Sequence, residues 1–124
     1  MESRIEYLGL QYTDSDPLME NWRADISDRI AADLFVHGKI IFAPVSTWHH
    51  TARKYDLPGT FEYWAELDEE FIKISKKLLI ITLPGWEDSV GVTGEIELAN
   101  KYNIPIEYID PYPYLTEEEK RKYL

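Results

Sequence analysis

The sequence predicts an α/β protein, and three observations support this fold class. Short apolar runs alternate with longer amphipathic stretches, which is the pattern of strands joined by helices. The run "LLIITLP" at 78–84 is apolar throughout, as in a strand covered on both faces. Helical connections of this length require crossovers, which join parallel strands. We therefore expect one domain over residues 1–124, with a mostly parallel sheet of four to five strands flanked by helices, as in Rossmann-like and flavodoxin-like folds.

The first half of the chain supplies two expected strands and one helix. "RIEYLGL" at 4–10 is the first expected strand, and "KIIFAPV" at 39–45 is the second. Between them, the stretch 15–38 begins with Ser and Asp, carries a proline in its first turn and ends on Gly38, which are signals of helix start and stop. The stretch 46–59, "STWHHTARKYDLPG", is expected to be a long polar and aromatic loop in which a helical turn can form.

The second half continues the alternation. Residues 60–77 have helical spacing, 78–84 is the third expected strand, 91–103 is a helix and 104–110 is the fourth strand. The tail at 111–124 contains a short charged helix. Ligands of such sheets bind beyond the carboxyl ends of the strands, so the strand-to-helix loops are the expected place for a functional site. These loops are 9–17, 44–60 and 83–92, and the long second one is expected to form a lid or wall of the pocket.

The amino-acid composition limits the kinds of molecule that the protein can bind. The net charge of −10, without a basic cluster, opposes binding to a nucleic-acid polymer. The absence of cysteine excludes disulfides, thiolate metal sites and cysteine nucleophiles. No apolar run approaches the length of a membrane-spanning helix, and no signal-peptide pattern is present. We therefore expect a cytoplasmic protein that does not bind a membrane.

Glu95 lies at the edge of the apolar face of the helix that follows the third strand. At about 100° per residue, Val92, Ile96 and Ala99 fall within about 60° of one another and should pack on the sheet. Glu97 projects about 140° from Val92 and should be solvated, whereas Glu95 lies about 60° from Val92 on the other side. The positive helix end favours an ionised carboxylate there, available as nucleophile or base. The alternative is that Glu95 only decorates a helix N-terminus.

Asp68 lies in the middle of the apolar stripe of the preceding helix. The inward positions of that stripe are Phe61, Trp64, Ala65, Phe71, Ile72 and Ser75. A carboxylate among them is costly unless it is paired, hydrogen-bonded, protonated or facing a cavity. Asp68 is therefore either a buried residue satisfied by a hydroxyl or backbone amide, or a functional residue.

Two carboxylates on adjacent elements suit chemistry at a glycosidic carbon. One carboxylate must be ionised to trap an oxocarbenium-like centre, and the other can have a raised pKa and protonate the leaving group. We expect Glu95 to be the ionised partner and Asp68 the desolvated one.

Three stretches of the chain resemble a known family. In order, "YLGLQY", "ELDEEFIKISKKLLIIT" and "PGWEDSVGVTGEIELANKYNIPIEYID" are similar to the nucleoside 2-deoxyribosyltransferase-like superfamily, including small members with a Leu-Pro-Gly-Trp-Glu third loop. The resemblance covers Ile5 to about Asp110. It implies that Glu95, after the Gly-Val pair, is the nucleophile that forms a deoxyribosyl-enzyme intermediate. It further implies that Asp68 assists at the base and sugar and that Tyr7 helps to hold the nucleophile.

The resemblance implies cleavage or transfer of the N-glycosidic bond of a 2'-deoxynucleoside or related nucleotide. Attack by water would make the protein a hydrolase, and attack by a second base a transferase. The candidate substrate-binding residues are Tyr12, Trp86, Asp88, Ser89 and Gly91. Trp86 is an aromatic wall for a base or a packing residue, and Asp88, like Glu87, binds a sugar hydroxyl or, as we prefer, caps the following helix. The first loop, "GLQYTDSDP", departs from the monophosphate glycosidases because it has no basic residue, which argues against phosphate recognition there.

Other functions remain open at this point. A non-catalytic nucleoside- or nucleotide-binding module of the same fold is the main alternative, and a structural or interaction protein is the third. No metal site is expected, because the adjacent His49 and His50 should point apart and lack a third ligand. No cofactor is expected, because the chemistry is acid-base and nucleophilic. The resemblance also implies a homodimer or higher homo-oligomer, in which Tyr112 and Tyr114 could reach a neighbouring subunit; alternatively, the tail folds back on its own domain.

Overall fold

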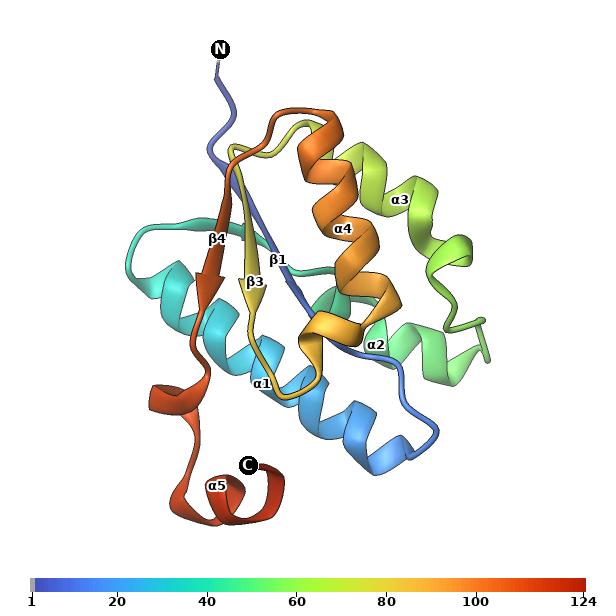
Figure 1. Cartoon of the computed structure of the whole chain (residues 1–124), viewed down its shortest axis with the longest axis vertical. Helices are drawn as coiled ribbons and strands as arrows, with labels where there is room; N and C mark the ends of the chain where they lie inside the picture. The colour runs from blue at the N-terminus through green and yellow to red at the C-terminus, as the bar shows by residue number, and fades with distance from the viewer. Residues whose placement is uncertain (1) are drawn as a thin grey trace.

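Four parallel strands form a sheet in the order β2-β1-β3-β4 in the computed structural model, which describes residues 2–124 (Figure 1). The strands are β1 (Ile5–Leu10), β2 (Ile40–Phe42), β3 (Lys77–Ile81) and β4 (Ile106–Ile109). The helices are α1 (Pro17–Val36), α2 (Pro44–Lys54), α3 (Phe61–Lys73), α4 (Val90–Lys101) and α5 (Glu117–Tyr123). The structure confirms the predicted α/β class, with every strand pair parallel. None of the helices in residues 2–124 has the length and apolarity required to span a lipid bilayer.

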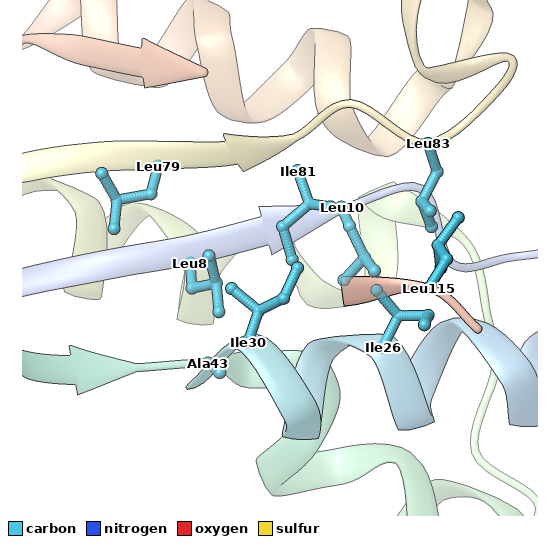
Figure 2. Packing of buried hydrophobic residues seen from close by; sticks show 9 residues of the cluster. All are labelled: Leu8, Leu10, Ile26, Ile30, Ala43, Leu79, Ile81, Leu83 and Leu115. Carbon is cyan, nitrogen blue, oxygen red and sulfur yellow. The ribbon is translucent and has the colours of Figure 1, made fainter. Parts of the chain in front are cut away.

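The sheet is covered on both faces, which explains why β3 is apolar after Lys77. One apolar cluster packs against α1 and is drawn in Figure 2: Leu8, Leu10, Ile26, Ile30, Ala43, Leu79, Ile81, Leu83 and Leu115. The second cluster lies under α3 and α4: Tyr7, Ile72, Leu78, Ile80, Val92 and Ala99. Successive residues of a strand face opposite sides, so Tyr7 and Leu8 belong to different clusters. This alternation places Tyr7 on the α4 side of the sheet.

The ends of α1 follow from the residues that the sequence supplies. The Asp16 side chain accepts a hydrogen bond from the Leu18 amide at 2.9 Å, and Pro17 fills the first turn, where its missing N–H costs nothing. Beyond the helix, Gly38 has a φ of 93°, which side chains with a Cβ rarely adopt. The predicted start and stop signals are therefore confirmed.

The structure corrects the expectation for residues 46–59. Most of this segment belongs to α2, an eleven-residue helix, and β2 is only three residues long. Pro44 ends the strand because it cannot donate to the ladder, and it starts the helix because its φ is already suitable. A helical repeat of i, i+3, i+4 and i+7 is present, and its residues line a cavity: Val45, Trp48, His49 and Ala52. The repeat was not recognised in the sequence because two of its positions hold Trp48 and His49 instead of aliphatic residues.

The C-terminal segment packs on α1 of its own chain. The Trp22 ring stacks on Tyr123, with ring centroids 3.8 Å apart. The Glu119 carboxylate accepts hydrogen bonds from Arg29 Nη1 at 2.8 Å and from Trp22 Nε1 at 2.8 Å, and chiefly the bond from Arg29 lowers the pKa of Glu119 to about 2. Tyr114 donates to Asp33 at 2.6 Å. The tail thus folds back on its own domain, and oligomerisation stays a prediction without support from Tyr114.

Replacing Glu119 should detach this tail. Glu119→Ala removes the charge-assisted bonds to Trp22 and Arg29 and one half of a capping box with Thr116, so the free energy of unfolding should fall by about 1–3 kcal/mol. Urea denaturation at pH 7 measures the change. The exposed neighbour Glu118 provides the control, since Glu118→Ala should have little effect. Equal stabilities of the two variants would contradict the role of Glu119 in holding the C-terminal segment on α1.

Candidate active site

A cavity of about 860 Å³ opens beyond the carboxyl ends of the strands. This volume lies within the range of small-molecule pockets, roughly 300–1,000 Å³. Its wall is built from the segments that follow β1, β2 and β3, namely residues 10–13, helix α2 with the start of α3, and residues 88–91. All three loops that the sequence marked as candidates therefore contribute to one cavity.

Glu95 reaches this cavity from the second turn of α4. Val92 and Ala99 of the same helix are buried against the sheet, and their packing draws the Glu95 side chain over β1, where only 7% of the residue is exposed. A Cβ atom on Gly9 would lie 2.7 Å from Glu95 Oε1 and 3.0 Å from Oε2. Glycine at position 9 is therefore what allows the carboxyl to rest on the central strand.

Asp68 approaches from α3 and is equally buried, at 7% exposure. Its position relative to Glu95 depends on the contact between α3 and α4. A Cβ atom on Gly94 would lie 2.3 Å from Cζ of Phe61, so the phenyl ring sits directly on the backbone of α4. This contact fixes the spacing of the two helices, and both carboxyl groups line the cavity. We refer to Asp68 and Glu95 together as the carboxyl pair.

Tyr7 completes the buried end of the site. The residue is fully buried in β1, and its pKa is raised well above the ordinary value, first by burial and then by the charges of Glu95 and Asp68. The hydroxyl is close to both carboxyl groups, but it meets neither with the distance and angle of a regular hydrogen bond. Within residues 2–124, it is one of two buried side-chain polar atoms without a partner. A small movement of either carboxyl can complete the hydrogen bond.

Burial raises the pKa values of both members of the carboxyl pair. Burial, followed by the charge of Asp68, raises the pKa of Glu95 to about 8. Burial raises the pKa of Asp68 to about 6, against a lowering effect of Tyr7. The expectation that the helix N-terminus keeps Glu95 ionised is therefore wrong for the free protein, because the helix dipole acts within the first turn and Glu95 lies beyond it. Both shifts keep the pair partly protonated at a pH where exposed carboxyl groups are fully ionised.

Four of the five predicted substrate-binding residues line the cavity: Tyr12, Asp88, Ser89 and Gly91. Ser89 also caps α4, since its Oγ accepts a hydrogen bond from the Val92 amide at 3.2 Å. The expectation that Glu87 or Asp88 is the cap is therefore wrong. Asp88 is exposed at the cavity wall instead, where its carboxylate is free of the helix end.

Trp86 does not line the cavity, which corrects its prediction as a substrate-binding residue. It packs against Tyr108, with ring centroids 5.2 Å apart, and covers the edge of the α4-side cluster. The aromatic wall is supplied instead by Trp48 and Trp64, whose ring centroids lie 5.5 Å apart. Their pairing joins α2 to α3, and it escaped the sequence analysis because residues 46–59 were expected to be a loop.

Charged side chains make the cavity strongly acidic. Six carboxyl-bearing residues contribute to the wall: Glu20, Asp56, Glu62, Asp68, Asp88 and Glu95. Among the described lining residues, Arg53 is the only lysine or arginine, and it is paired with Glu20 at 2.8 Å. Arg23 is held elsewhere, because its guanidinium donates to the carbonyl oxygens of Tyr12 and Thr13. Residues 2–124 contain no cluster of three side chains that could ligate a metal.

The contact between Gly9 and Glu95 can be tested by adding one methyl group. Gly9→Ala should lower the free energy of unfolding by about 1–3 kcal/mol, because the new Cβ overlaps the carboxyl oxygens. The loss should be smaller in the Glu95→Ala background, where those oxygens are absent. Gly59→Ala is the control, since its Cβ would meet Thr13 at an ordinary 3.8 Å. Additive losses for Gly9→Ala and Glu95→Ala would contradict the contact.

The raised pKa of Glu95 should make stability fall as pH rises. The unfolded chain releases this proton near the ordinary glutamate pKa of 4.5, whereas the folded protein keeps it up to about pH 8, so stability is lost between these values. We expect Glu95→Gln to match the wild type near pH 5 and to exceed its free energy of unfolding by a few kcal/mol at pH 8. Urea denaturation at both pH values measures this. Glu97→Gln, on the exposed face of the same helix, is the control. Parallel pH profiles of stability for Glu95→Gln and wild type would refute the raised pKa of Glu95.

Comparison with known proteins places the chain in a family. No curated protein matches the sequence significantly. Residues 4–110 match the model of a family described as a domain of unknown function, DUF1937. The match spans strand β1, which carries Tyr7 and Gly9, and helices α3 and α4, which carry Asp68 and Glu95. The chain therefore belongs to the DUF1937 family.

Proposed function

We propose that this protein cleaves or transfers the N-glycosidic bond of a 2'-deoxynucleoside or a related compound. The observation that carries the proposal is the carboxyl pair, in which two buried carboxyl groups with raised pKa values line one cavity close to the Tyr7 hydroxyl. Glycosidic cleavage needs one proton donor and one ionised carboxylate at the same carbon. A pair with one proton supplies both near neutral pH.

The first step would transfer the sugar to the protein. The proton of the carboxyl pair first moves to Asp68, which leaves Glu95 ionised. A Glu95 oxygen then bonds to the anomeric carbon as the carbon–nitrogen bond breaks, and the electron pair of that bond leaves with the base. The proton passes from Asp68 to the departing base nitrogen, so the base leaves neutral and Asp68 becomes ionised. The Tyr7 hydroxyl, close to both carboxyls, can hold the Glu95 oxygen that does not react.

The second step would release the sugar. Water, or the ring nitrogen of a second base, attacks the anomeric carbon and breaks its ester bond to Glu95. Asp68 accepts the proton of the attacking group, and the carboxyl pair again holds one proton. The proposal needs no cofactor, because these two carboxyl groups provide the nucleophile and every proton transfer.

The charges of the wall favour a substrate without a 5'-phosphate. A phosphate dianion would meet a cavity with six carboxyl-bearing residues, in which Arg53 is already paired with Glu20. Like charges brought together in this way weaken binding. The rings of Trp48 and Trp64, by contrast, suit an uncharged aromatic base. The resemblance to the nucleoside 2-deoxyribosyltransferase-like superfamily supports the same chemistry.

A non-catalytic nucleoside-binding module is the second candidate. The acidic cavity with its tryptophan pair would serve it equally well. The carboxyl pair favours the enzyme, because two desolvated carboxyl groups reduce stability and binding alone does not require both.

Incubation with the four 2'-deoxyribonucleosides and their 5'-monophosphates, with and without a free base, tests the proposal. Chromatography should show base release or exchange with at least one nucleoside, and about tenfold less with its monophosphate because of the acidic wall. Glu95→Gln should lower the rate by roughly three orders of magnitude, because the nucleophile is gone. Asp68→Asn should lower it about 10²–10⁴-fold.

The exposed residue Glu97 on the same helix gives the matched control, and Glu97→Gln should keep full activity. Binding without turnover would favour the non-catalytic module. Turnover that survives in Glu95→Gln would refute the proposed nucleophile.

A further inference from the structure

His49 forms a hydrogen-bonded pair with Tyr12 in the cavity wall. The Tyr12 hydroxyl and His49 Nδ1 are 2.5 Å apart, and the two rings meet edge to face with centroids 5.4 Å apart. Tyr12 follows β1 and His49 belongs to α2, so the bond links two elements that are far apart in the sequence. Both residues line the cavity.

The surroundings of the pair determine the position of its protons. Burial, followed by the charge of Arg53, lowers the pKa of His49, so the ring is neutral near pH 7. Burial raises the pKa of Tyr12, so the phenol keeps its proton. Among residues 2–124, His49 Nδ1 is the only hydrogen-bond partner of the Tyr12 hydroxyl. The single phenol proton is then directed to His49 Nδ1.

This arrangement leaves one hydrogen-bonding atom of the ring unused. A neutral histidine that accepts at Nδ1 carries its own proton on Nε2. In the described part of the chain, the hydrogen bond to Tyr12 is the only one made by the His49 ring. Nε2–H is therefore a fixed donor in the wall of an otherwise acceptor-rich cavity.

We propose that His49 donates a hydrogen bond from Nε2 to an acceptor atom on the base of the bound nucleoside, and that Tyr12 positions the ring for this bond. The inference rests on the proposed function. If the sugar lies at the carboxyl pair, the base extends to the wall formed by α2 and α3, where His49 lines the same cavity as the paired Trp48 and Trp64 rings. The tryptophan rings and the His49 Nε2–H donor together select a planar base that carries an acceptor atom.

The tautomer can be tested without any ligand. Long-range ¹H–¹⁵N correlation spectra at pH 7.5 should show His49 as a neutral ring with its proton on Nε2, and His49→Gln identifies its signals among the three histidines. Tyr12→Phe should shift His49 Nδ1 and restore a mixture of tautomers. A ring that is protonated on Nδ1 or charged in the wild type would overturn the proposal.

The contact to the base can be tested by calorimetry in the Glu95→Gln background, which prevents turnover. The probes are the best-bound 2'-deoxyribonucleoside and analogues in which one acceptor atom of its base is replaced by C–H. One analogue should bind about five- to tenfold more weakly than the parent nucleoside, as expected for one lost hydrogen bond. The difference should vanish in His49→Phe and persist in part in His49→Gln, whose amide can donate from a similar position.

The outcomes separate this inference from the proposed function. If an analogue remains equally disfavoured in His49→Phe, nucleoside binding stands and the role of His49 is wrong. If no analogue is disfavoured in the presence of His49, the role of His49 is again wrong. If no deoxyribonucleoside binds at all, the proposed function fails together with the base contact, even where the tautomer is confirmed.

Discussion

The close approach of the Glu95 carboxyl to the backbone of β1 is the constraint on which the rest of the site depends. The approach is possible because residue 9 has no side chain, so the second turn of α4 can lie directly on a central strand. Val92 and Ala99 hold the helix in that place through the same apolar cluster that contains Tyr7. One packing arrangement therefore brings a phenol and a carboxyl together in the interior.

Burial raises the pKa values of the carboxyl pair and also reduces the stability of the protein. Within residues 2–124, neither carboxyl group has a cationic partner, and desolvation is the largest cause of both raised pKa values. Proteins tolerate such groups where other parts of the fold provide the stability, and perturbed carboxyls are concentrated at functional sites. Here the two apolar clusters on either face of the sheet offset the cost. The arrangement is costly for a structural role and well suited to proton transfer.

The fold and the inward positions of Glu95 and Asp68 could be predicted from the sequence, because both depend on the periodicity of apolar residues. Alternating runs predicted the parallel sheet, and helical phase alone placed Glu95 and Asp68 on the inner sides of their helices. The raised pKa of Asp68 was expected, whereas that of Glu95 was missed, because depth of burial is a property of the whole fold and not of one helix. Helix α2 was missed because Trp48 and His49 occupy apolar-face positions that face a cavity. The roles of Gly9 and Gly94 depend on contacts between distant segments, which a single sequence does not reveal.

The placement of the tryptophans has a practical consequence. Two of the four indoles, Trp48 and Trp64, stand in the wall of the cavity, whereas Trp22 is stacked on Tyr123 and Trp86 packs on Tyr108. A molecule that enters the cavity would displace water from the first two rings and leave the surroundings of the other two unchanged. The intrinsic fluorescence of the protein thus contains a built-in optical reporter of occupancy, and ligands of unknown identity can be screened without a label or an activity assay.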